Sequence, residues 1–307
     1  MLQTMKRILV TGATGFIGCH SLPLLMDHGY EVHAVSSKDK GSYYPGVRWH
    51  KSNLLDFKQT EALLRNVRPT HLLHFAWYTI PGEFWNSQEN LCWLQASIHL
   101  LRKFVEQNGR RAVFAGTCAE YNWNFGFCSE SITPCEPATL YGTCKHSMRL
   151  ILESYAKETG LSAAWGRIFF PFGPYEHPDR VVPYVIRSLL KGEFAACSHG
   201  NQIRDFLYVE DVAEAFVKIM ESSVCGPVNV GSGQPIVLKD LIFKIAEVLD
   251  RPDLIKLGSR STSHDEAPLV LANVGRLYSE IKWQPKYDLD QAINKSVEWW
   301  QENMSNP

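Results

Sequence analysis

The 307-residue sequence has no block of Lys and Arg, and its 31 basic side chains are balanced by 32 acidic ones. Short basic pairs such as Lys6-Arg7 and Arg110-Arg111 are too small to follow a phosphate backbone, which argues against nucleic acid as a partner. The sequence also lacks a run of about 18 apolar residues, and residues 1–10 contain no apolar segment typical of a signal peptide. We therefore expect a cytoplasmic protein without a membrane span.

The eight cysteines form no Cys-x-x-Cys pair, and no histidine stands at a spacing suited to zinc. No metal site is expected, and scattered thiols are typical of a reducing compartment. The signature of disorder is missing too, because 45% of the residues are hydrophobic and the net charge is only −1. The chain is long enough to bury a large core.

What the sequence does contain is an alternation of apolar runs and helical periodicities over its first 170 residues. Strands are expected at 8–10, 31–35, 47–50, 71–75, 112–115 and 163–169, and helices between them include 59–65, 90–107 and 142–159. Strands that alternate with helices predict an α/β fold with a doubly wound parallel sheet, the Rossmann fold.

After about Phe170, prolines, glycines and charges interrupt this rhythm. Helical spacing returns at 181–190, 211–220 and 238–249. We expect residues 1–170 with 204–231 to form an NAD(P)-binding Rossmann domain, and residues 171–203 with 232–307 to form a smaller, mostly C-terminal substrate-binding lobe. Trp299 and Trp300 are expected to anchor a core or an interface.

Three glycines, Gly12, Gly15 and Gly18, directly follow the first strand and open the next helix. Glycines allow a sharp turn and a close approach to a pyrophosphate, whose charge is favoured by free N–H groups and by the helix dipole. The context of strand, turn and helix therefore predicts a dinucleotide site, with Phe16 and Ile17 completing the turn.

The type of dinucleotide depends on the end of the second strand, which reads Ser36-Ser37-Lys38. A carboxylate there would bond a ribose 2′-hydroxyl and repel a 2′-phosphate, but the first carboxylate is Asp39. Two hydroxyls and an ammonium group favour NADP(H) over NAD(H). A solvated turn would have the same composition.

Tyr141 and Lys145 stand four residues apart at the start of an expected helix, so they lie on one face of it. A Lys ammonium beside a phenol lowers the pKa of the phenol towards the range in which it exchanges protons with a hydroxyl or a ketone. Thr117 follows the strand at 112–115, at the edge where open α/β sheets bind ligands, and can bond the same oxygen. These three residues are the candidate catalytic set.

Together these motifs resemble the extended short-chain dehydrogenases/reductases of the NAD(P)-dependent epimerase/dehydratase family, whose members mostly act on nucleotide-activated sugars. The resemblance covers nearly the whole chain. The segments that match the family are the Thr11-Gly-x-x-Gly-x-x-Gly opening, the Tyr-x-x-x-Lys pair, His74-Phe75-Ala76, Asn90, Arg167 to Pro174, and Gly200 to Ala213.

The resemblance implies cofactor contacts from Phe75 and Ala76 and from Asn53-Leu54, where the family usually has an Asp. It also implies a homodimer that packs through the helices near 90–107 and 142–158, and an Arg204 that binds the diphosphate of a nucleotide-diphosphate sugar. An ion pair with Asp205 or Asp211 is the alternative role for Arg204.

Two departures from the family bear on the reaction. Phe170 replaces an Asn, which removes a usual hydrogen bond to phosphate or sugar. Family members that dehydrate sugars at C4–C6 carry an acid directly after the Thr, whereas here the first carboxylate, Glu120, comes three residues after Thr117. A 4,6-dehydratase is therefore disfavoured.

We expect hydride transfer at sugar C4, either by a 4-keto-sugar reductase, which the NADP(H) argument favours, or by a C4 epimerase. Cys118 and His177 are candidates for the Cys/His pair of a 3,5-epimerase/reductase resembling the fucose-forming enzymes, although Cys118 lies one position early. Glu176 and Arg180 are candidates to line the sugar pocket. A non-catalytic NAD(P)-binding sensor or scaffold is a further alternative, against which the complete Thr117, Tyr141 and Lys145 set argues.

Overall fold

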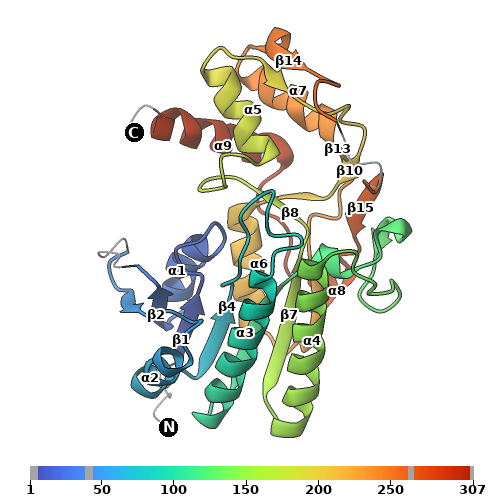
Figure 1. Ribbon diagram of the computed structural model, residues 1–307. Coiled ribbons are helices and arrows are strands. Elements are labelled where there is room, and N and C mark those ends of the chain that lie inside the picture. Colours follow the sequence, from blue (N-terminus) through green and yellow to red (C-terminus); the bar gives the residue numbers. More distant parts are fainter. Residues whose placement is uncertain (1–5, 39–43, 262–265, 305–307) are drawn as a thin grey trace.

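The computed structural model describes residues 6–38, 44–261 and 266–304, and its centre is a seven-stranded parallel sheet (Figure 1). The strands are ordered β12-β7-β5-β4-β1-β2-β3. Their bounds are β1 Arg7–Thr11, β2 Glu31–Ser36, β3 Arg48–Lys51, β4 His71–His74, β5 Arg111–Thr117, β7 Ser162–Ile168 and β12 Gly226–Val230. Every neighbouring pair is parallel. The predicted doubly wound α/β fold is confirmed.

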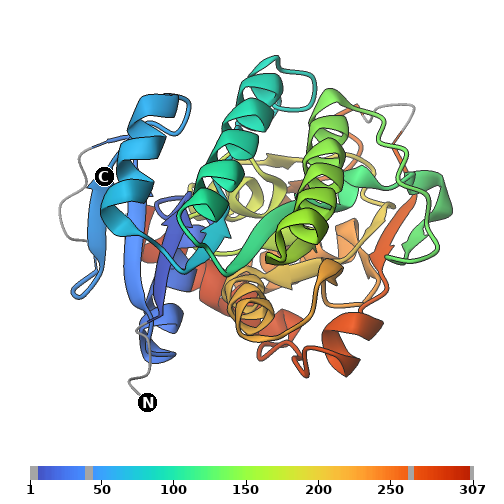
Figure 2. The ribbon, with the colours of Figure 1, turned by 90° about the horizontal axis from the view of Figure 1, so that it is seen from below.

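Helices cover both faces of this sheet, as Figure 2 shows along its edge. One face carries α2 (Phe57–Val67), α3 (Glu89–Glu106) and α4 (Leu140–Thr159), and the other carries α1 (Gly18–Asp27) and α6 (Val209–Glu221). Side chains of a strand alternate between the two faces, so Ile8 and Val10 pack towards α1 and α6 while Leu9 packs towards α2 and α3. Burial on both faces explains the continuous apolar runs of the sequence.

A smaller lobe lies above the carboxyl ends of the strands in Figure 1. Its core joins α5 (Val181–Leu190), α7 (Leu238–Val248) and α9 (Leu289–Met304), and Trp299 and Trp300 pack into it as predicted. Its strands form a four-stranded sheet and two pairs: β6 Phe127–Cys128, β10 Ile203–Arg204, β13 Ile236–Val237 and β15 Leu269–Ala272; β8 Phe170–Phe172 with β11 Phe206–Tyr208; β9 Ala195–Ala196 with β14 Ile255–Lys256. Short 3-10 helices are η1 Cys118–Glu120, η2 Trp123–Phe125 and η3 Pro252–Leu254.

The expected boundaries differ from the packing at α8, and one of them passes through β10. Helix α8 (Gly275–Ser279) and the residues after it pack on the large sheet, where Leu277 and Trp283 join the core around Phe216. Conversely, β10 pairs with β13 and β15 rather than with the large sheet. Pairings between distant short strands leave no local pattern from which a boundary could be predicted.

All eight cysteines are free thiols. Within residues 6–38, 44–261 and 266–304, no helix is both long and apolar enough to span a membrane. Over the same ranges no group of three or more His, Cys, Asp or Glu side chains is arranged to hold a metal ion.

Candidate functional site

The turn from β1 to α1 is so tight that only glycine fits at two of its positions. Gly12 has a φ of +65°, and a Cβ on it would lie 2.7 Å from the backbone nitrogen of Ala76. A Cβ on Gly18 would lie 2.2 Å from the carbonyl oxygen of Gly12. Helix α1 begins at Gly18 without a side-chain cap, so its first N–H groups face the turn. Such a cradle fits the pyrophosphate of a dinucleotide.

A buried histidine holds this turn against the next strand. His74 at the end of β4 hydrogen-bonds Thr11 (Nδ1 to Oγ1, 2.7 Å) and Ser97 of α3 (Nε2 to Oγ, 2.9 Å). The Thr11 hydroxyl also accepts the backbone N–H of Ala76 at 3.3 Å. Burial lowers the pKa of His74 to about 3, so the ring is neutral. Phe75 and Ala76 are thereby fixed beside the glycine turn.

The residues predicted to choose between the two dinucleotides are only partly organised. Ser36 is the last residue of β2 and is buried, and its Oγ accepts the backbone N–H of Lys38 at 3.2 Å. Ser37 and Lys38 are exposed. Asp39 lies outside the described residues.

Asn53 and Leu54 follow β3 with opposite environments. Asn53 is exposed and its side-chain oxygen accepts the N–H of Leu55 at 3.1 Å, whereas Leu54 is buried against α2 and α3. The amide oxygen of Asn53 is thus engaged in its own turn.

The structure brings Thr117 and Tyr141 together at the carboxyl ends of the strands. Thr117 is the last residue of β5, and α4 begins at Leu140 after the N-cap Thr139, whose hydroxyl accepts the N–H of Gly142 at 3.1 Å. Tyr141 is buried, and the Thr117 side chain lies near its phenol. Lys145, one turn along α4, is also buried and donates from Nζ to the carbonyl of Ala115 at 2.9 Å.

Lys145 is not among the groups that shift the pKa of Tyr141 in this structure, so its effect on the phenol stays a prediction. Burial raises the pKa of Tyr141, and the Thr117 side chain lowers it by less. The same burial lowers the pKa of Lys145 to about 7, against the charge of Glu120, which raises it. Desolvation disfavours the charged form of both groups, and it is the largest cause of both pKa shifts.

Glu120, the carboxylate nearest to Thr117 in sequence, points back into the core. It is fully buried and accepts hydrogen bonds from the backbone N–H of Thr117 (2.9 Å), from Trp165 Nε1 (2.7 Å) and from Arg167 Nε (2.9 Å). Both carboxylate oxygens are therefore engaged within the core, Oε1 by Thr117 and Trp165 and Oε2 by Arg167. The Glu120 side chain is thus directed into the core, and its difference from a dehydratase acid stays a prediction.

Arg204 is buried, and its partner is Glu266, with Nη2 and Oε1 3.1 Å apart. Asp205 instead accepts from Ser232, Gly233 and Ala272, and Asp211 accepts the N–H groups of Lys286 and Tyr287. The alternative ion pair of Arg204 with Asp205 or Asp211 is therefore wrong. Glu266 was missed because nothing in the sequence links two residues 62 positions apart.

Phe170, the departure from the family pattern, lies beneath this arginine. The Arg204 guanidinium stands 5.5 Å from the centre of the Phe170 ring, which also packs against Phe206. The Phe170 ring makes a cation–π contact with the guanidinium, whereas an Asn at this position would make a hydrogen bond.

Cys118 and His177 lie in different surroundings. Cys118 is buried in an apolar cluster with Tyr121 and Phe169, and burial raises the pKa of its thiol well above the usual value. His177 is exposed and lies 3.7 Å from Asp179. These surroundings do not support a proton-transfer pair, because the thiol stays protonated and the imidazole faces solvent.

Two other candidates come from the loop between β8 and α5. Arg180 is exposed, with its guanidinium 5.6 Å from the centre of the Phe84 ring, beside Tyr141. Glu176 is buried, burial raises its pKa to about 8, and its Oε2 has no hydrogen-bond partner among the described residues.

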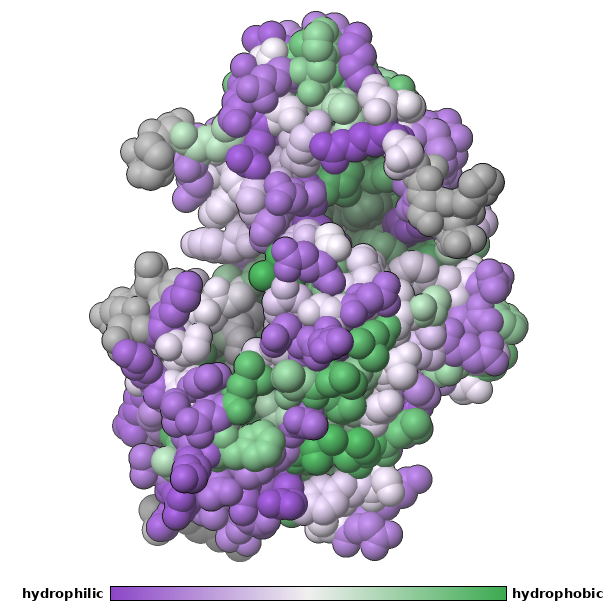
Figure 3. Space-filling view, in the orientation of Figure 1, coloured by the Kyte–Doolittle hydropathy of each residue, from purple (hydrophilic) through white to green (hydrophobic). Residues whose placement is uncertain are grey.

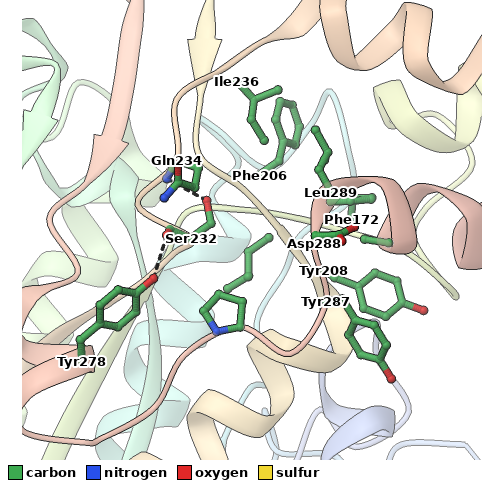
Figure 4. A pocket seen from close by; sticks show the side chains of 13 residues that line it. Phe172, Phe206, Tyr208, Ser232, Gln234, Ile236, Tyr278, Tyr287, Asp288 and Leu289 are labelled. Atoms are coloured by element: carbon green, nitrogen blue, oxygen red, sulfur yellow. Dashed lines mark hydrogen bonds between the residues drawn. The ribbon is translucent and has the colours of Figure 1, made fainter.

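A separate cavity of about 290 Å³ lies between the two parts of the molecule (Figure 4). Five of the 13 residues that line it are aromatic: Phe172, Phe206, Tyr208, Tyr278 and Tyr287. Tyr278 closes one side by donating to the carbonyl of Ser232 at 3.1 Å. None of the residues predicted for the site lines this cavity.

Residues 8–231 match the NAD dependent epimerase/dehydratase family. Among characterised relatives, the chain is 24% identical to human dTDP-D-glucose 4,6-dehydratase, covering 98% of this chain and 91% of that one. It is 24% identical to UDP-glucuronate 4-epimerase 2 of Arabidopsis thaliana, covering 95% of this chain and 75% of that one.

Solved structures of other proteins superimpose on nearly the whole of this chain. A UDP-N-acetylglucosamine 4-epimerase from Methanobrevibacter ruminantium, in complex with UDP-N-acetylmuramic acid, superimposes with a TM-score of 0.87 at 26% identity, covering 98% of this chain and 99% of that one. UDP-glucose 4-epimerase from Thermus thermophilus, in complex with NAD, superimposes with a TM-score of 0.85 at 25% identity, covering 96% and 99%. The match over 8–231, with the glycine turn and the Tyr-x-x-x-Lys helix inside it, means that this chain belongs to the NAD dependent epimerase/dehydratase family of nucleotide-sugar-modifying enzymes.

Proposed function

We propose that this protein is an NAD(P)-dependent nucleotide-sugar C4 epimerase. The observation that carries the proposal is the proximity of the Thr117 and Tyr141 side chains at the carboxyl end of β5, near a glycine turn that fits a pyrophosphate. Relatives of both 4-epimerase and 4,6-dehydratase activity support sugar C4 as the reacting position.

In this mechanism Tyr141 exchanges the proton of the C4 hydroxyl, and Thr117 holds the same oxygen. Lys145 stabilises the phenolate whenever its ammonium is protonated, and its position against the carbonyl of Ala115 fixes that ammonium. Arg204 is a donor of two parallel N–H groups for the substrate diphosphate, once Glu266 shares or releases it.

The cradle formed by Gly12, Gly15, Phe16, Ile17 and Gly18 is proposed to hold the pyrophosphate of the dinucleotide, with Phe75 and Ala76 beside it. A bound NAD(P) would supply the hydride acceptor and donor for C4. We propose that Ser36, Ser37 and Lys38 at the end of β2 accept a 2′-phosphate, so that NADP(H) binds better than NAD(H). Direct titration of both dinucleotides tests this order.

A 4,6-dehydratase needs an additional acid next to the reacting carbons, and Glu120 is fully engaged by Thr117, Trp165 and Arg167. A 4-keto-sugar reductase is the second candidate, because no carboxylate precedes Asp39 at the end of β2. The two candidates differ in stoichiometry. An epimerase regenerates its dinucleotide in each turnover, whereas a reductase consumes one NAD(P)H for each sugar.

The test is proton NMR of the anomeric signals of UDP-glucose and dTDP-glucose, recorded with absorbance at 340 nm. A new epimer without a net absorbance change supports the epimerase, and loss of NADPH with a 4-keto sugar supports the reductase. Tyr141→Phe should lower kcat by about 10²- to 10⁴-fold while nucleotide affinity stays unchanged. Unchanged turnover of this variant would remove Tyr141 from the mechanism.

We infer a homodimer that forms through α3 and α4. Figure 3 shows hydrophobic side chains gathered over these two helices on an otherwise largely polar face. Leu91 and Leu150 are 46% and 48% exposed, and Trp93, Leu94 and Ile98 are half-buried on α3. A second copy of this chain would cover both helices.

A further inference from the structure

Thr117 stands at the head of a capping box that the proposed chemistry does not by itself explain. It is the last residue of β5, and its Oγ1 accepts the backbone N–H of Ala119, in η1, at 3.2 Å. In return, Oε1 of Glu120 accepts the backbone N–H of Thr117 at 2.9 Å. The side chain and the backbone of Thr117 are therefore both held by the three residues that follow it.

The same Glu120 carboxylate is attached to the neighbouring strand. Strand β7 pairs with β5 and contributes Trp165, whose Nε1 donates to Oε1 at 2.7 Å, and Arg167, whose Nε donates to Oε2 at 2.9 Å. Gly116 makes room for this approach, because a Cβ on it would lie 2.0 Å from Trp165 Nε1 and 2.7 Å from Glu120 Oε1. Glu120 thus ties the end of β5 to two side chains of β7.

Arg167 is itself held by a buried network. Its Nη1 donates to the Tyr121 hydroxyl at 2.7 Å, its Nη2 donates to Sγ of Cys135 at 3.1 Å, and the guanidinium stands 4.3 Å from the centre of the Tyr121 ring. Tyr121 in turn donates to Oδ1 of Asn229, on β12, at 2.8 Å. Glu120, Arg167, Tyr121 and Asn229 are all buried. A buried network whose members satisfy one another is rigid, so the anchor of Glu120 is a fixed one.

The capping box also decides what the Thr117 hydroxyl can do. A hydroxyl has one O–H donor and two lone pairs, so an oxygen that accepts the N–H of Ala119 keeps its O–H for another partner. The Tyr141 phenol lies near this hydroxyl at the carboxyl end of β5. Thr117 is therefore set to donate on the side where the reacting oxygen is expected.

We propose that Glu120 is a positioning residue for the reaction: its carboxylate, anchored to β7 through Trp165 and Arg167, holds Thr117 so that the hydroxyl donates to the sugar C4 oxygen. The proposal rests on the C4 epimerase function proposed above. Because Glu120 is fully buried, it acts through Thr117 and not by touching the substrate. Displacing a catalytic group by about 1 Å can cost about 10²-fold in rate, so this support bears directly on turnover.

The experiment is a double-mutant cycle between Glu120 and Thr117, in which kcat and KM of the holoenzyme are measured with UDP-glucose and dTDP-glucose. Thr117→Val removes the hydroxyl and should lower kcat about 10²-fold. Glu120→Gln has one acceptor oxygen where the carboxylate uses two, and it should lower kcat about tenfold while KM stays unchanged. In the Thr117→Val background, Glu120→Gln should lower kcat no further, because the hydroxyl that Glu120 positions is gone.

Two further variants complete the set. Glu130→Gln is the matched control, because Glu130 also accepts a backbone N–H, that of Asn229 on β12 at 2.8 Å rather than that of Thr117, and kcat should stay at the wild-type value. Thr117→Ser keeps the hydroxyl and loses only a methyl group. Since the capping box rather than the β-branch orients the hydroxyl, this variant should keep kcat within about threefold of the wild type.

Retained binding of the dinucleotide shows that a variant is folded. If Glu120→Gln leaves kcat unchanged, or lowers it by the same factor with and without the Thr117 hydroxyl, Glu120 does not act through Thr117; this proposal is then overturned and the epimerase proposal stands. If Glu120→Gln does not fold, Thr117→Ser decides, because a loss as large as that of Thr117→Val would overturn the role of the capping box. If the wild-type protein converts neither nucleotide sugar, both proposals fail together.

Discussion

Glu176 is a carboxyl group that burial holds in its protonated form. Its pKa rises from the ordinary 4.5 to about 8, since desolvation outweighs the opposing charge of Arg180. Below pH 4.5 the group is protonated in both the folded and the unfolded chain. Between pH 4.5 and about 8 only the unfolded chain releases the proton, so the free energy of unfolding falls by about 1.4 kcal/mol for each pH unit.

Glu176→Gln removes this dependence, because an amide does not ionise. We expect the variant to gain stability relative to the wild type as the pH rises from 6 to 8, by about 2–3 kcal/mol at most. Urea unfolding of the apo proteins at pH 6, 7 and 8 measures the difference, and every other titrating group is common to both proteins. A stability difference that stays constant over this range would contradict the buried, protonated carboxyl.

At the scale of single residues, the sequence predicted which members of the candidate catalytic set meet better than it predicted their environment. Thr117 and Tyr141 meet because a strand end and a helix start are local features with recognisable signals. The pKa of Lys145 depends on burial beneath Trp77, and the partner of Arg204 depends on a contact across 62 residues. Burial and long-range pairing follow from the packed chain, so composition and spacing could not show them.

At the scale of elements, the turn between β1 and α1 offers a test in which two effects oppose each other. Gly18 begins α1, and helix propensity alone would favour alanine there by about 1 kcal/mol. The Cβ, however, would lie 2.2 Å from the backbone oxygen of Gly12, which cannot move without opening the turn. Overpacking against backbone costs about 1–3 kcal/mol, so the clash outweighs the gain in helix propensity.

Gly18→Ala should therefore lower the melting temperature and weaken NAD(P) binding at least about tenfold, as measured by calorimetry. Gly275→Ala is the matched control. Gly275 also begins a helix, but the nearest atom to an added Cβ is the Asn273 side-chain oxygen at 3.0 Å, which accepts the Gly275 N–H and belongs to a side chain rather than to the backbone. Equal dinucleotide affinity in the two variants would show that the turn is not the phosphate cradle.

The elements themselves were largely predictable. Helices α3, α4 and α5 begin and end within about two residues of the ranges expected from periodicity, because each carries an apolar stripe that its sequence displays. The two-residue strands of the lobe, such as β10 and β13, were not predicted. They are too short to show an alternation, and they exist only because distant segments meet.

At the scale of the whole molecule, the alternation of strands and helices predicted the parallel sheet. It did not predict how the chain passes between the large sheet and the smaller lobe. The chain crosses from the lobe to the large sheet again at α8, where Leu277 and Trp283 complete a core begun by β1 and α6. A core shared by the first and last quarters of the sequence predicts that neither part folds alone.

The dimer inferred for α3 and α4 is also a property of the whole molecule. Leu91 and Leu150 are too exposed to contribute much to the fold of one copy. An interface of standard size buries about 800 Å² of surface on each partner, and these leucines would lie within it. The double variant Leu91→Glu, Leu150→Glu places four carboxylates in the interface and should therefore give a monomer of 34.9 kDa in light scattering, where the wild type gives twice that mass. Phe194→Glu, at a residue 59% exposed in the lobe, should leave the mass of the dimer unchanged. A wild-type monomer at micromolar concentration, or a dimer that survives both carboxylates, would mean that these helices face solvent.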